Sequence, residues 1–158
     1  MTLYNTIIKP VLLYGAETWS ITKKGEHQLQ VFGNKVYRKI FGGYFEQSTQ
    51  TWKRRHNVDI HGLAKQPNIV ATMNANRLRW MGHLMRVDRN RAAWSIYTST
   101  PQGRRLPGRP RSCWRNEMMR LCQKWYLDDW QEATQDRVQW RQRVWSARDL
   151  QAPNAPTE

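Results

Sequence analysis

The sequence predicts an all-α protein: an irregular bundle of about five helices with a basic arm and a disordered C-terminal tail. Two observations support this fold class. Apolar residues recur at steps of three and four along several stretches of the 158 residues, which is the spacing of one helix face. Glycine and proline separate these stretches, and one segment rich in both residues excludes a helix.

The first predicted helix covers residues 3–14 and has apolar side chains on nearly every face. Pro10 lies in its middle and has no backbone N–H, so we expect a kink or a break near residue 9. Gly15 ends the helix. If nothing packs on this helix, its apolar surface is exposed, and we expect poor solubility.

The second predicted helix covers residues 25–41 and ends at Gly42-Gly43. Gly33 inside it is expected to weaken it. Its apolar stripe is Leu29, Phe32, Val36 and Ile40. The polar segment 44–58 that follows is interpreted as a loop with a short basic patch.

A short helix is expected at residues 60–65, and a long amphipathic helix at residues 68–86. Gly82 in the long helix is a candidate for close contact with another helix. The expected inward side chains are Val70, Met73, Arg77 or Leu78, Met81 and Leu84. Residues 91–99 are ambiguous between strand and helix.

Residues 100–111 contain three prolines and two glycines and are predicted to form an extended, exposed arm. Ser112 is expected to cap the next helix. The apolar face of that helix is Trp114, Met118, Leu121, Cys122 and Trp125.

The last helix is expected to begin at Asp129, because Asp129 and Glu132 have the spacing of a capping box. Its expected buried side is Trp130, Ala133, Trp140, Val144 and Ala147. The tail, residues 151–158, is expected to be disordered.

Charge is the strongest indication of function. The chain has 26 Lys and Arg against 12 Asp and Glu, a net charge of +14. Residues 61–125 hold 13 basic and 2 acidic residues, whereas residues 126–158 hold 4 and 6. Such an excess attracts a polyanion by phosphate neutralisation and counterion release. We therefore expect RNA and/or DNA as partner; an acidic membrane or protein surface and a merely solvated face are the alternatives.

The sequence contains no self-contained active site. The four histidines are scattered along the chain and lie away from the two cysteines. They do not form the closely spaced His or Cys pairs that bind a metal ion. The acidic cluster at 128–136 is explained by helix capping. The sequence also has no phosphate-binding loop motif and no nucleophile motif. We predict no catalytic residue, metal, cofactor, small-molecule substrate or membrane span. Cysteine usage favours a reducing intracellular compartment, nuclear or cytoplasmic.

Basic side chains in the loop, on the long helix and in the arm are candidates for phosphate contact. They are Lys53, Arg54, Arg55, Arg77, Arg79, His83, Arg86, Arg104, Arg105, Arg109, Arg111 and Arg115. Within the arm, Gly108-Arg109-Pro110 is similar to the centre of an AT-hook, which enters the minor groove, although generic phosphate contact is favoured. Trp52 and Trp94, beside basic or loop segments, are candidates for stacking on unpaired bases.

Several segments, taken in order, resemble a known family. They are residues 3–19, 36–42, 77–84, 103–105 with 108–111, Trp114, and Asp136-Arg137 followed by Trp140. Over about residues 3–147 the series resembles the C-terminal region of reverse transcriptases of non-LTR (LINE-type) retrotransposons; the match is loose at 44–62. The resemblance implies a thumb and a following helical region that grip template–primer. The family's catalytic aspartates lie in an upstream palm motif, which no segment here matches.

With this resemblance the chain divides into six expected segments. They are a thumb-like helical segment (1–43), a variable basic loop (44–62), a basic amphipathic helical segment (63–99), the arm (100–111), a C-terminal helical hairpin (112–150) and the tail (151–158). The resemblance implies phosphate contacts from Arg77, Arg79, His83 and the arm, and a palm domain as a further partner.

Three interpretations remain open at this stage. The leading one is a nucleic-acid-binding fragment, not an enzyme by itself. A second is a decayed retroelement copy without function, which failure to fold cooperatively would indicate. A third is the tail of an active RNA-directed DNA polymerase, which an upstream palm motif would establish.

Overall fold

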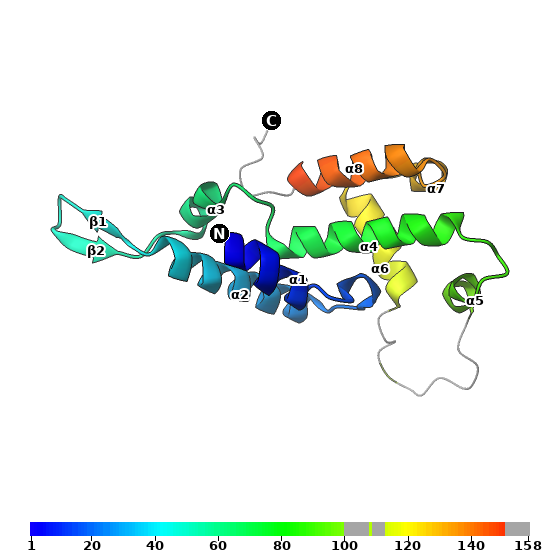
Figure 1. The fold of residues 1–158 in the computed structure, drawn as a ribbon, viewed down its shortest axis with the longest axis horizontal. Coiled ribbons are helices and arrows are strands. Elements are labelled where there is room, and N and C mark those ends of the chain that lie inside the picture. The colour runs from blue at the N-terminus through cyan, green and yellow to red at the C-terminus, as the bar shows by residue number, and fades with distance from the viewer. Residues whose placement is uncertain (100–107, 109–112, 151–158) are drawn as a thin grey trace.

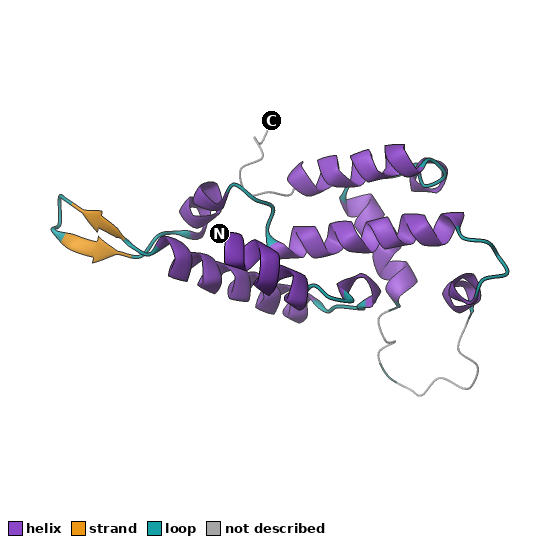
Figure 2. Ribbon diagram, in the orientation of Figure 1, coloured by secondary structure: helices purple, strands orange, loops and turns teal. Residues whose placement is uncertain are grey.

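The computed structural model describes residues 1–99, 108 and 113–150. These residues are mostly helical, which confirms the predicted all-α class, and the strands present form one two-stranded sheet (Figure 2). Helix α4 (Ile69–Arg86) occupies the centre, with α8 (Arg137–Leu150) along one side and α2 (Lys23–Phe41) on the other (Figure 1). The expected disordered tail lies outside the described residues.

The N-terminal helix forms without a break at Pro10. A π-helical turn, Tyr4–Ile8 (η1), runs directly into α1 (Lys9–Leu12). The N–H of Lys9 donates to the carbonyl of Tyr4, five residues back. This wider turn makes room for the Pro10 ring, which would clash with the carbonyl four residues back in a regular α-helix.

The predicted apolar exposure of this helix is present. Leu3, Ile7 and Val11 are 71%, 55% and 73% exposed, whereas Tyr4 is buried. Gly15 then adopts a φ of 68°, in the left-handed region, and leads into a 3₁₀ turn, Ala16–Thr18 (η2).

Helix α2 confirms the predicted second helix, but its buried face differs from the expected stripe. Phe32 and Ile40 are each 40% exposed. Tyr37 is buried instead, because its ring packs edge-on between the rings of Tyr4, at 5.2 Å, and His61, at 5.7 Å. The buried side of α2 is thus set by an aromatic cluster rather than by the aliphatic stripe.

The prediction of a loop at 44–58 is wrong. Strands β1 (Tyr44–Glu46) and β2 (Thr51–Lys53) pair antiparallel and project away from the helices (Figure 1), and α3 (Asn57–Ala64) follows. The rings of Phe45 and Trp52, partners in the register, lie 5.6 Å apart edge to face. Three-residue strands are too short to display the alternation by which strands are recognised in a sequence.

The main core lies where α4 meets α6 (Trp114–Lys124), α8 and the segment between them. It confirms Leu78 and Met81 on the long helix and most of the predicted apolar faces of α6 and of the last helical region, where Trp114 and Trp130 are only partly buried. Its buried members are Ala75, Leu78, Met81, Met118, Leu121, Cys122, Trp125, Leu127, Ala133, Trp140, Val144 and Ala147. Met73 belongs to a second cluster, against which the partly buried Val70 packs. The ambiguous residues 91–99 form a helix, α5 (Ala92–Thr98). The expected cap Ser112 lies outside the described residues.

The last helix does not run on from Asp129. A short α7 (Trp130–Ala133) and α8 are separated by a connection at residues 134–136. The guanidinium of Arg86 donates to the carbonyl of Thr134, while the N–H of Val138 donates to the Asp136 carboxylate at 2.7 Å. In a continuous helix the N–H of Val138 would donate to the carbonyl of Thr134. Here each of these groups has another partner, and Asp136 caps α8. The expected cap, Asp129, instead pairs with Arg143.

Candidate nucleic-acid interface

A basic cleft of about 640 Å³ opens between α4 and α8. It combines positive charge with aromatic rings and holds one carboxylate among its lining residues. Those residues are Glu17, Asn76, Arg79, Trp80, His83, Arg86, Arg137, Trp140 and Arg141. We refer to it below as the α4–α8 cleft.

Helical spacing gives the cleft its two basic walls. On α4, Arg79, His83 and Arg86 follow one another at steps of four and three, so they share one face of the helix. On α8, Arg137 and Arg141 are four residues apart and likewise share a face. Because α8 packs along α4, the two faces line the same opening.

On α8, the Arg141 guanidinium lies 4.3 Å from the Trp145 ring centroid. On α4, Arg86 is held in place at the cleft. Its guanidinium donates to the backbone carbonyl of Thr134. Burial lowers the pKa of Arg86, the positive charge of Arg137 lowers it further, and Asp136 acts in the opposite direction. An arginine nevertheless stays protonated in proteins, so the cleft holds a partly desolvated cation that an anionic oxygen would stabilise.

Aromatic rings lie beside these cations. The Trp80 indole and the His83 imidazole are 5.1 Å apart between centroids, at an interplanar angle of 33°. Both side chains line the α4–α8 cleft. The cleft can therefore combine phosphate contact with stacking on a planar group.

A second cavity, of about 420 Å³, lies at the same end of α4. It brings together two residues predicted from the sequence, Trp94 on α5 and Arg115 on α6. The other lining residues are Met85, Val87, Arg89, Tyr97, Thr98, Met119, Trp130, Gln131 and Gln135. We call it the aromatic cavity.

Arg77, predicted to contact nucleic acid, lies in the interior. Its side chain is 3% exposed, and its guanidinium donates to the Glu117 carboxylate at 2.5 Å and to Asn74 at 3.4 Å. Ser20 also donates to Glu117, at 2.6 Å. Arg77 therefore joins α4 to α6 and is not part of the exposed basic surface.

The predicted basic patch of Lys53, Arg54 and Arg55 is on and just after the hairpin, which lies at the opposite end of the molecule from α7 and the start of α8 (Figure 1). Arg137, at the start of α8, lines the α4–α8 cleft. Lys53 pairs with Glu46, and Arg55 lies 5.6 Å from the Tyr44 ring centroid. Trp52 is 75% exposed there. These residues are not brought together with the cleft. The arm residues Arg104, Arg105, Arg109 and Arg111 lie outside the described residues.

Sequence reasoning missed Arg137 and Arg141. Their spacing of four residues in a predicted helix was the available signal. The net negative charge of residues 126–158 concealed it. Two acidic residues of that segment have partners that only the tertiary structure shows: Asp129 pairs with Arg143, and Asp136 accepts from the amides of α8.

Two further observations concern metals and membranes. Within residues 1–99, 108 and 113–150, no three His, Cys, Asp or Glu side chains are grouped so that they could hold a metal ion. In that same part of the chain, no helix has both the length and the apolar character needed to cross a membrane.

Comparison with known proteins finds a similar protein. A Caenorhabditis elegans protein described as uncharacterised and transposon-derived is 23% identical over 86 residues, which are 54% of this chain and 30% of that protein. The chain thus spans under a third of the length of the relative it matches. No family model matches the chain. No solved structure matches it.

Proposed function

We propose that this chain is a non-catalytic nucleic-acid-binding region that holds a phosphate backbone in the α4–α8 cleft. The observation that supports the proposal is the convergence of Arg79, Arg86, Arg137 and Arg141 on one cleft. Planar guanidiniums suit bidentate contact with phosphate, and a cleft lined by one sign of charge concentrates the field on a polyanion. The arm arginines Arg104, Arg105, Arg109 and Arg111 add further phosphate contacts in this proposal.

The proposed origin of the chain is a retroelement reverse transcriptase, of which it represents the region after the palm. The ordered resemblance over residues 3–147 supports this origin. The likeness to a transposon-derived protein is consistent with it. In that setting the bound polyanion is template–primer or target nucleic acid, and the chemistry belongs to the parent enzyme.

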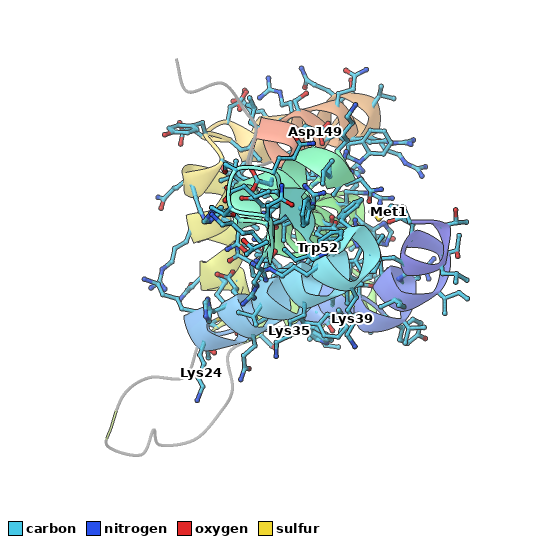
Figure 3. The ribbon with its side chains drawn as sticks, turned by 90° about the vertical axis from the view of Figure 1, so that its left-hand side faces the viewer. Met1, Lys24, Lys35, Lys39, Trp52 and Asp149 are labelled. Atoms are coloured by element: carbon cyan, nitrogen blue, oxygen red, sulfur yellow. The ribbon has the colours of Figure 1, made fainter. Side chains whose placement is uncertain are left out.

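A matched pair of triple variants tests the proposal. One replaces Arg79, Arg137 and Arg141 with glutamine. The other replaces Lys24, Lys35 and Lys39 on the outer side of α2 with glutamine (Figure 3). It removes the same charge from a helix that does not line the cleft. Fluorescence anisotropy with single-stranded RNA, duplex DNA and an RNA–DNA hybrid, over a series of salt concentrations, measures affinity and salt slope.

We expect the cleft variant to bind more weakly and to lose about 2–3 units of the log–log salt slope, because each phosphate contact contributes about 0.7–0.9. The lysine variant should stay close to the wild type. Equal losses in the two variants would mean that binding follows net charge alone. A folded wild-type chain that binds none of the three probes would overturn the proposal and favour a remnant without function.

A further inference from the structure

We propose that the aromatic cavity binds an unpaired nucleobase, so that the chain engages single-stranded nucleic acid. This inference rests on the proposed function, since it names the form of the polymer that the cleft holds. The cavity volume of about 420 Å³ lies within the usual range of small-ligand sites, about 300–1,000 Å³. Three features of the cavity fit a planar ligand that has a polar edge and is attached to a phosphate.

The first feature is the set of aromatic walls, which come from different elements. Trp94 and Tyr97 belong to α5, and Trp130 belongs to α7. The Trp94 and Tyr97 rings are 5.8 Å apart and tilted by 42°, so they do not stack face to face on each other. All three side chains are only partly buried, and all three line the cavity.

The second feature is a polar rim. Gln131 and Gln135 offer amide groups that both donate and accept, as the edge of a base requires. Arg89 and Arg115 are exposed, and the Arg115 guanidinium lies 5.4 Å from the Tyr97 ring centroid. The rim thus supplies cations for a phosphate next to a base that stacks on the walls.

The third feature is the position of the cavity relative to the α4–α8 cleft. Gln135 lines the aromatic cavity, and Arg137, two residues later, lines the cleft. Gln135 belongs to the connection at residues 134–136, which Arg86 fixes through the Thr134 carbonyl. A strand whose phosphates occupy the cleft can therefore place a base in the cavity by crossing this connection. A base paired in a duplex cannot leave its stack for the cavity without breaking the pair.

Substitution of Trp94 tests the inference. The 158-residue chain is titrated with a fluorescent oligothymidylate and with an abasic strand of the same length, which keeps the phosphates but has no bases. Trp94→Leu keeps an apolar side chain without a ring, and Trp94→Phe keeps a ring. Tyr14→Leu, at a residue that is 87% exposed and outside both cavities, is the matched control.

We expect the wild type to prefer the base-containing strand by at least about fivefold, which is the lower end of the affinity gain expected from stacking one base on an aromatic side chain. Trp94→Leu should lose most of this preference while its affinity for the abasic strand and its salt slope stay unchanged. Trp94→Phe should retain most of the preference, and Tyr14→Leu all of it.

Two results would overturn the inference while leaving the proposed function intact. One is equal wild-type affinity for base-containing and abasic strands. The other is a base preference that survives in Trp94→Leu, which would place the base elsewhere. Failure of the wild type to bind either strand would overturn both the inference and the proposed function.

Discussion

Gly82 on α4 lies directly against the indole of Trp140 on α8. A Cβ atom on Gly82 would come within 2.2 Å of the Trp140 Nε1 atom, and this same Nε1 donates to the Leu78 carbonyl at 2.9 Å. The bond satisfies the one polar group of a side chain that is 1% exposed. The glycine and the tryptophan together fix how closely the two walls of the α4–α8 cleft approach.

Gly82→Ala is expected to destabilise the fold. The new methyl group must displace Trp140 and weaken its hydrogen bond, and overpacking of this kind costs about 1–3 kcal/mol, only partly offset by the higher helix propensity of alanine. Gly33→Ala is the control, because its Cβ would lie 3.5 Å from Ile69 in ordinary contact. That variant should be neutral or more stable by up to about 1 kcal/mol. Urea unfolding measures both; equal stability of the two variants would contradict the close contact at Gly82.

The predictable part of the fold is the part in which apolar spacing decides which face is buried. The inward positions of α6 and of α8, and the close contact at Gly82, follow from helical periodicity and from the small size of glycine. Burial of Tyr37 in place of Phe32 and Ile40 could not be foreseen, because it depends on Tyr4 and on a partner helix distant in sequence.

The candidate site was predicted on only one of its walls. Arg79, His83 and Arg86 stand out on a strongly basic amphipathic helix, whereas Arg137 and Arg141 occur among acidic residues whose partners only the tertiary structure reveals. Arg77 was expected both as an inward candidate of the long helix and as a phosphate contact. Its burial agrees with the first expectation, and Glu117, forty residues away, makes that burial tolerable.

Arg77 and Glu117 give a prediction that separates a structural role from a binding role. Glu117→Gln leaves the buried guanidinium without a countercharge and is expected to cost about 2–4 kcal/mol in urea unfolding. Replacing both residues with methionine should recover most of this loss, because no unpaired charge remains. The double variant should also bind nucleic acid like the wild type. A loss of affinity in a folded double variant would mean that Arg77 contributes to nucleic-acid binding.

Asp136 gives the last prediction, because it links the start of α8 to the cleft. Its carboxylate accepts from the N–H of Val138 at 2.7 Å and of Gln139 at 3.1 Å, so Asp136→Ala should cost about 0.5–2 kcal/mol, as expected for loss of a helix cap. Asp136→Asn keeps an accepting oxygen and should cost less. Because Arg137 begins α8, fraying of this turn should also weaken nucleic-acid binding in Asp136→Ala, even though an acidic residue has been removed. Chemical unfolding and anisotropy on the same samples test this. Tighter binding by Asp136→Ala would mean that the carboxylate acts only by repelling phosphate and that its cap does not position Arg137.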